Sequence, residues 1–334
     1  MNKHARPGDA DVRLVVDGIV GRLAPGRSVI ALRREASPFA TSARLWDLQV
    51  TISDGTALAL IHKESGRQAR LQGAPRSMPA FLYDPRREID VYERLLAPSS
   101  LDTPRLYASV VQPSRGRYWM FLERASGIQL RWAVEPAAWH RTAAWLARAH
   151  ATLESNAERS GSSLVAHDAR YYRRWLRRAQ ILTERTDPNR RTRLAWLGIH
   201  YDRLVEVLVG LPRTVIHGEF YPSNILVDES TPDGRITVVD WEMAALGPAV
   251  TDLASLTGGR VTPPEREAIL AAYRNAVPSD TADRPEWLGP EALACARLHF
   301  CVQWMGWSRD WSPPAEQRHD WLAEAVELGE MMGW

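Results

Sequence analysis

Apolar residues recur along this chain at two spacings, one typical of helices and one typical of strands. Before about residue 125 the short apolar runs favour strands at 33–39, 42–50, 57–63 and 118–123. Apolar positions at helical spacing predict helices over 11–23, 84–96, 137–153, 165–183, 193–210, 263–275, 289–307 and 316–331. The pattern therefore predicts an α+β protein whose first part is mainly strands and whose second part is mainly helices.

Three further apolar runs interrupt the helical part: Thr214–Ile216, Ile225–Val227 and Ile236–Val239. Turn-forming residues at 231–235 separate the last two, so we expect short strands around a loop. Three polar residues, Glu219, Asn224 and Asp240, follow or precede these runs, so strand ends on a rigid scaffold are expected to hold them.

Phosphoryl transfer of the kinase type uses side chains of these kinds in this order. It needs a carboxylate beside the acceptor hydroxyl, an amide oxygen on the metal ion, and a second carboxylate between metal and phosphates. Glu219, Asn224 and Asp240 match the three roles in turn, with Asn224 and Asp240 holding Mg²⁺.

The motif His217-Gly-Glu-(x)4-Asn224, followed by Val239-Asp-Trp-Glu242, resembles the core of the aminoglycoside phosphotransferase and choline kinase-like family. That family usually has Asp where this chain has Glu219. The resemblance implies a bilobal protein-kinase-like fold, with a small β-sheet N-lobe that has one main helix and a larger, mostly helical C-lobe. We expect the N-lobe over 1–123 and the C-lobe over 124–334.

The resemblance also implies the activity. A kinase of this family would transfer the γ-phosphate of ATP (or GTP), with Mg²⁺, to a hydroxyl of a small molecule such as an antibiotic, a sugar or another natural product. Glu219 would be the base, and its side chain is one methylene longer than that of aspartate. The alternative is a nucleotide-binding pseudokinase or regulatory protein of the same fold.

Lysine usage adds one candidate. Of 42 basic residues only Lys3 and Lys63 are lysines, and Lys63 ends the strand-like run 57–63. A compact ammonium suits the α- and β-phosphates where a guanidinium fork does not. The resemblance implies that Glu88 pairs with Lys63. Glu93 is the competitor, about 140° away around the same helix.

Other nucleotide contacts rest on weaker patterns. The resemblance places the adenine hinge near Glu123 and Ala125. The stretch 36–42 stands where a protein kinase has a glycine-rich loop, and Ser42 is a candidate phosphate contact there, with Ser37 and Thr41 as further hydroxyls. An ordinary loop turned by a proline is the alternative.

Several residues resemble structural members of the family. We expect His150 to lie in the core, Asp252 to support the catalytic loop from a helix start, and His217 to brace that loop. Trp241 should pack under the loop. Glu242 is a candidate support for an arginine or a backbone group nearby, and its catalytic role is left open.

The acceptor region is less defined by sequence. Trp304, Trp307 and Trp311 recur at helical spacing, which fits either packing between helices or stacking on a ligand. Five arginines share one helical face: Arg170, Arg173, Arg174, Arg177 and Arg178. Such a face is usually solvated, and the alternative is an anionic acceptor or an acidic partner. A polycationic acceptor would need an acidic pocket, and the sequence shows no dense acidic cluster that would form one.

Composition and charge argue against several classes of protein. A net charge of +2 gives no argument for nucleic-acid binding, and no run of about 18 apolar residues predicts a membrane span. The N-terminus has no apolar core of a secretory signal, and Cys295 and Cys301 fit buried thiols in a reducing compartment, so a cytoplasmic location is expected. The sequence does not define the acceptor, the choice between ATP and GTP, or the oligomeric state.

Overall fold

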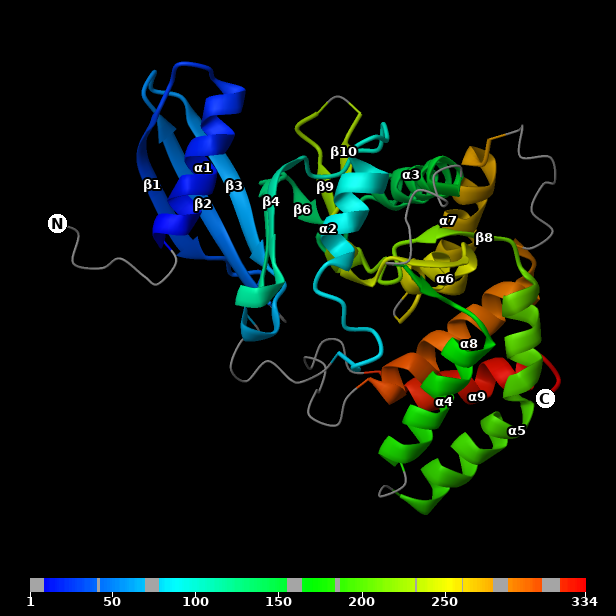
Figure 1. Cartoon of the computed structure of the whole chain (residues 1–334). Coiled ribbons are helices and arrows are strands. Elements are labelled where there is room, and N and C mark those ends of the chain that lie inside the picture. The colour runs from blue at the N-terminus through cyan, green and yellow to red at the C-terminus, as the bar shows by residue number, and fades with distance from the viewer. Residues whose placement is uncertain are drawn as a thin grey trace. The chain divides into compact units, whose positions relative to one another are not determined.

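The computed structural model describes residues 9–40, 43–69, 78–154, 164–183, 187–231, 233–259, 261–278, 288–307 and 319–334. The chain forms two compact units (Figure 1). The first unit comprises 1–74 and 104–125, and the second comprises 75–103 and 126–334. The segment 75–103 groups with the second unit, and the expected lobe bounds of 1–123 and 124–334 stay predictions.

The first unit is an antiparallel sheet of five strands in the order β1-β2-β3-β5-β4. Their bounds are β1 Val29–Ala36, β2 Arg44–Ile52, β3 Ala57–Glu64, β4 Leu106–Gln112 and β5 Arg117–Glu123. A turn at Asp54-Gly55 joins β2 to β3, as the sequence predicts, and Gly55 has a φ of 88° there. Strand β4 was not predicted.

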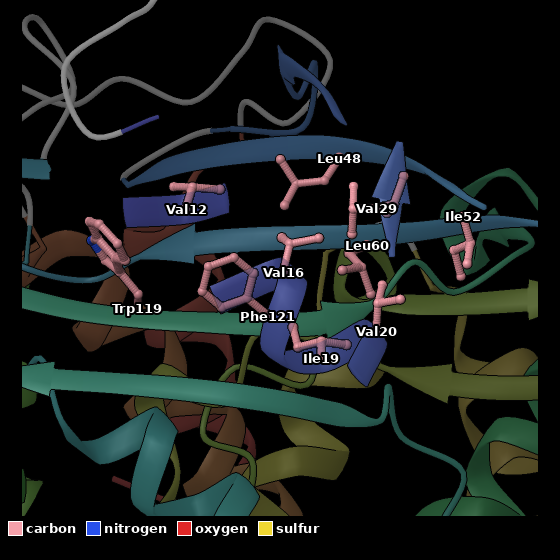
Figure 2. Close-up of a cluster of buried hydrophobic side chains, with 11 residues drawn as sticks. Val12, Val16, Ile19, Val20, Val29, Leu48, Ile52, Leu60, Trp119 and Phe121 are labelled. Atoms are coloured by element: carbon pink, nitrogen blue, oxygen red, sulfur yellow. The ribbon is translucent and has the colours of Figure 1, made fainter. Parts of the chain in front are cut away.

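Helix α1 (Asp9–Leu23) supplies the other half of this unit's core (Figure 2). It buries Val12, Val16, Ile19 and Val20, which lie on one face because they are three or four residues apart. They pack with strand residues such as Phe121. Each such side chain contributes about 1.5–3 kcal/mol when fully buried, so this face anchors the helix.

The second unit is mainly helical and contains two small three-stranded sheets, in the orders β10-β9-β6 and β7-β11-β8. The helices are α2 Arg87–Val91, α3 Pro136–Glu154, α4 Ala169–Thr183, α5 Pro188–Gly210, α6 Val250–Leu256, α7 Pro263–Ala276, α8 Pro290–Gly306 and α9 Trp321–Met331. The strands are β6 Ile128–Gln129, β7 Val165–Ala166, β8 Arg213–Ile216, β9 Ile225–Asp228, β10 Arg235–Val238 and β11 Ala245–Pro248.

Local chemistry explains where the helices depart from prediction. Val165–Ala166 pairs in parallel with β11, so α4 begins at Ala169 rather than at 165. Helix α5 begins five residues earlier than predicted, because Pro188 occupies its first turn and the Asp187 side chain caps it. Helix α2 continues into a wider turn over Tyr92–Leu96.

The helices of the second unit pack around α8, which contacts α4, α6 and α9, while α3 packs on α7. Both cysteines lie buried and free in α8, as expected. No helix in the described parts of the chain is long and apolar enough to cross a membrane.

Candidate active site

The loop after β8 carries the first motif. Strand β8 pairs with β11, and both Val215 and Ile216 are fully buried, so the strand delivers the chain to His217 on a fixed support. Glu219 is half-buried, two residues further on. A single 3-10 turn, Pro222–Asn224, then leads into β9.

Asp252 holds this loop from the first turn of α6. Its carboxylate is completely buried and accepts hydrogen bonds from the backbone N–H groups of His217 (2.8 Å) and Gly218 (2.9 Å). Bonds from N–H groups to a carboxylate are about twice as strong as neutral ones. The expected supporting role of Asp252 is therefore confirmed.

Asp252 is itself held by a second chain of bonds. The Nε2 atom of His150, on α3, lies 3.1 Å from its Oδ2, and Nδ1 of His150 lies 2.8 Å from the hydroxyl of Tyr273 on α7. The Thr214 hydroxyl donates to the backbone carbonyl of His150. His150 is only 5% exposed, so it occupies the core position that the sequence indicates.

Gly218 is required by the loop's geometry. Its φ is +82°, and a Cβ atom at this position would lie 2.3 Å from the backbone oxygen of Met243. Only glycine fits both the left-handed backbone and this approach.

His217 braces the loop. Its Nδ1 accepts from the N–H of Glu219 (3.3 Å), so Nε2 carries the proton and donates to the carbonyl of Val239 (3.0 Å). The ring is 1% exposed and lies 4.7 Å from the ring of Trp241, which is also buried. Both predicted packing roles are confirmed.

The two motifs meet through the backbone. The N–H of Val239 donates to the carbonyl of Asn224 (2.9 Å), so Asp240 follows directly on a residue bonded to Asn224. The Asn224 amide nitrogen donates to the carbonyl of Glu219 (3.0 Å). This bond assigns the nitrogen, so Oδ1 is the atom that a metal ion would use.

Asp240 lies in a cluster of carboxylates. Glu88, Asp240 and Glu242 each offer an oxygen, and these atoms lie within 4.8 Å of one another. Asp240 has a φ of 67°, the only positive value at a non-glycine residue in the described ranges. Clustered carboxylate oxygens are ligands that suit Mg²⁺, so the residues of this cluster fit the ion.

Helix α2 carries Glu88 to this cluster. Glu88 is 2% exposed, whereas Glu93 is exposed. The neighbouring Arg87 donates to the backbone carbonyls of Glu242 (2.9 Å) and Leu82 (2.8 Å), which ties α2 to the turn after Asp240. Burial lowers the pKa of the Arg87 guanidinium.

Two tyrosines, Tyr171 and Tyr221, lie close enough to Glu219 for its charge to affect their pKa values. Burial, and then the Glu219 carboxylate, raise the pKa of Tyr221 well above its usual value. Tyr221 lies 5.8 Å from Trp304, which stacks on Trp321 at 5.4 Å. Trp307 stacks on Trp175, so both tryptophans pack against other helices, while Trp311 lies outside the described residues.

The remaining nucleotide candidates lie in the first unit. Lys63 sits in β3, between Leu45 of β2 and Met120 of β5, and is 9% exposed. The pairing of Lys63 with Glu88 joins the two units and stays a prediction. Ser42 lies outside the described residues, whereas Ser37 is described and is 5% exposed.

The expected hinge residues close the last strand of the sheet. The N–H of Glu123 donates to the carbonyl of Arg105 (2.8 Å), and its carboxylate accepts from the Arg105 N–H (3.1 Å). The N–H of Glu123 is thus already used. Contacts of Glu123 and Ala125 with adenine stay predictions.

Sequence reasoning assigned no role to Arg87 and Tyr273, and it did not place Glu242 in the carboxylate cluster. Glu242 ends the second motif, and its carboxyl type was the available signal. Arg87 and Tyr273 have no local signal, because their bonds reach residues 155 and 123 positions away.

Comparison with known proteins agrees with this geometry. The model of the phosphotransferase enzyme family matches residues 55–288. No curated protein matches the chain. A microcompartment-associated aminopropanol kinase has a similar fold, with a TM-score of 0.60, 15% identity, and coverage of 95% of this chain and 94% of that one.

Two further solved structures share the fold. The choline kinase LicA from Streptococcus pneumoniae has a TM-score of 0.55 and 15% identity over 97% of this chain and 99% of its own. The GDP complex of aminoglycoside 2'-phosphotransferase-IIIa has a TM-score of 0.54 and 14% identity over 96% and 97%. Because the family model spans most of the chain, the chain belongs to the phosphotransferase enzyme family.

Proposed function

We propose that this phosphotransferase transfers the γ-phosphate of ATP, with Mg²⁺, to a hydroxyl of a small molecule. The observation that carries the proposal is the junction of the two motifs. The Val239–Asn224 backbone bond and the His217–Val239 bond hold the amide of Asn224 beside the turn that bears Asp240. Solved structures of the same fold with GDP or AMP support nucleotide binding.

Each residue has a distinct task in the proposed step. The acceptor oxygen attacks the γ-phosphorus, the bond from that phosphorus to the bridging oxygen breaks, and ADP leaves. Glu219 takes the hydroxyl proton, and the loop bonds to Asp252 fix where Glu219 stands. Asn224 and Asp240, with Glu242 beside them, would hold Mg²⁺, which supplies charge neutralisation on the phosphates.

Lys63 would contact the α- and β-phosphates, held by Glu88. The hinge at Glu123 and Ala125 would bind the purine. The acceptor hydroxyl would lie beside Glu219, and Tyr221, which packs on Phe300 and Trp304, is a candidate for contact with the acceptor. An antibiotic, a sugar or another natural product is the acceptor class that we propose.

A panel screen tests this function. Purified protein, Mg²⁺-ATP and hydroxylated compounds are combined, ADP release is measured, and ³¹P NMR identifies a phosphate monoester. We expect at least one acceptor to raise ADP release well above the rate without acceptor. Glu219→Gln should lower kcat by about 10²–10⁴-fold, because the base is lost while the shape is kept.

Asp233→Asn is the matched control, since Asp233 is an exposed carboxylate in the β9–β10 turn. It should leave kcat unchanged. Acceptor-stimulated turnover that is equal in wild type and Glu219→Gln would contradict the assigned base. Binding of nucleotide without phosphorylation of any compound would favour the regulatory alternative.

A further inference from the structure

The outer face of α4 is strongly basic. The helix contains five arginines and no acidic residue. Its other face buries Tyr171, Tyr172 and Trp175 against the rest of the unit. The arginines recur at intervals of three and four, so they share the opposite side.

Four of these arginines line a hollow. An open depression of about 640 Å³ is bounded by Asp168, Ala169, Arg170, Arg173, Arg174 and Arg177. The fifth arginine, Arg178, turns away from it and donates to the carbonyls of Gly306 (2.9 Å) and Trp307 (3.0 Å). The hollow is thus lined by guanidinium groups that are not all used for packing.

Neutralisation of these charges is incomplete. Arg173 pairs with the exposed Asp202 at 2.8 Å. Arg170 and Arg177 have no hydrogen bond, ion pair or ring contact with any residue in the described ranges. The one carboxylate in the lining, Asp168, accepts the N–H of Tyr171 at 2.7 Å. Four guanidinium groups against the carboxylates of Asp168 and Asp202 leave an excess of two positive charges.

Arginine is the basic residue almost everywhere in this chain, so the residue type by itself carries no information. Some arginines elsewhere have an acid within reach, as in Arg141–Glu229, Arg274–Glu267 and Arg297–Glu324. The arginines of α4 are set apart by their spacing, which gathers them on one face. Like charges three and four residues apart on a helix repel one another, so this face is costly unless an anion covers it.

One guanidinium is already oriented. Arg174 lies over the ring of Phe81, with its Cζ atom 4.6 Å from the ring centroid, and Phe81 contacts Trp175 edge to face at 5.5 Å. A stacked guanidinium keeps its N–H groups in one plane, and that plane matches the two oxygens of a phosphate or carboxylate.

We propose that this hollow binds a small molecule bearing two or more phosphate or carboxylate groups. The arginines from 170 to 177 span about 10 Å along the helix, which is more than one anionic group covers. The depression is open to solvent, so attraction to the guanidinium groups, rather than enclosure, would hold the ligand. The proposal does not depend on the kinase function, because binding needs no turnover.

Calorimetric titration with inorganic tripolyphosphate tests the proposal. The variant Arg170→Glu/Arg177→Glu removes the two unpartnered cations. Arg148→Glu/Arg191→Glu makes the same change in charge at exposed sites on α3 and α5. We expect the first variant to lose one binding site, or at least tenfold in affinity at that site, and the control to keep it. The nucleotide site is the same in all three proteins, so the difference belongs to the hollow.

Further titrations distinguish phosphate ligands from carboxylate ligands and identify the results that would overturn the proposal. If citrate binds to the wild type and this binding is lost in Arg170→Glu/Arg177→Glu, the hollow accepts carboxylates. If only tripolyphosphate behaves in this way, the ligand is a phosphorylated molecule. Equal binding by wild type and Arg170→Glu/Arg177→Glu overturns the proposal, and so does an equal loss in both double variants. The proposal is also overturned if a single-stranded oligonucleotide binds the wild type more tightly than tripolyphosphate does and loses that binding in Arg170→Glu/Arg177→Glu. Arg170→Gln/Arg177→Gln replaces the first variant if thermal melting shows that it is misfolded.

Discussion

Replacing Gly218 by alanine tests how tightly the catalytic loop is fitted. A Cβ atom there would lie 2.3 Å from the backbone oxygen of Met243 and 3.1 Å from its carbonyl carbon. Contacts under 3.0 Å essentially do not occur for real Cβ atoms, so backbone must move by roughly 0.7 Å. The moving segment carries the N–H groups that bond to Asp252.

The expected magnitude has two parts. A side chain in the left-handed region costs about 1–2 kcal/mol. Strain on two buried bonds to a carboxylate adds about 1.5–3 kcal/mol. We therefore expect Gly218→Ala to lower the free energy of unfolding of the second unit by about 2.5–5 kcal/mol. A displacement of this size at Glu219 should also lower kcat by about 10²-fold.

Gly259 provides the matched control. Its φ is +69°, and an added Cβ would meet no atom within 4 Å. Gly259→Ala therefore pays only the backbone cost of about 1–2 kcal/mol and should keep kcat. Urea unfolding and hydrogen exchange at the amides of His217 and Gly218 measure both variants. Equal destabilisation by the two substitutions, with unchanged exchange at these amides, would refute the close approach.

Three further predictions follow from buried groups and from the metal. Asp252→Ala should lower the free energy of unfolding by about 3–5 kcal/mol in urea titrations, because His150 and two N–H groups lose their acceptor; a loss under about 0.5 kcal/mol would argue against it. His62 is fully buried, and burial lowers its pKa to about 3, so the unfolded chain binds a proton that the folded chain does not between pH 6.5 and 3. Stability should fall by about 1.4 kcal/mol per pH unit as pH drops through this window, and His62→Phe should remove that contribution from the pH profile of unfolding; an unchanged profile would show that His62 is not the group. EDTA should abolish phosphoryl transfer and Mg²⁺ should restore it in an ADP-release assay, whereas turnover that resists EDTA would exclude the metal role.

Local patterns were enough to predict most elements. The helix predicted over 137–153 is Pro136–Glu154, and the strand predicted at 118–123 is Arg117–Glu123. Their periodicity is clear because one face of the helix is buried and the strand is buried almost throughout. Strand β4 was missed because its residues are mostly half-buried, which leaves no strong alternation.

The site was predictable where it is contiguous. Glu219, Asn224 and Asp240 stand at fixed spacings in two short motifs, and backbone bonds between those motifs explain why the spacing matters. Glu88 joins Asp240 and Glu242, which stand in one motif, only through tertiary structure. Tyr273 hydrogen-bonds to His150 only because α7 packs on α3. The sequence pattern of either helix alone does not predict that contact.

The arginine face of α4 shows a different limit of prediction from sequence. Spacing alone predicted one basic face but could not separate a solvated face from a binding site. The structure divides the five arginines, because Arg178 bonds to the end of α8 while the other four line the hollow. Partners far apart in sequence determine that division.

Turnover by an Asp240 variant tests the central claim most directly. ADP formation from Mg²⁺-ATP with a hydroxyl acceptor is measured for wild type, Asp240→Asn and the control Asp233→Asn, at saturating nucleotide. We expect Asp240→Asn to lose at least about 10²-fold in kcat, because a neutral amide cannot replace a carboxylate between metal and phosphates. The control should match wild type. Asp240→Asn with wild-type turnover would contradict the proposal that this site performs phosphoryl transfer.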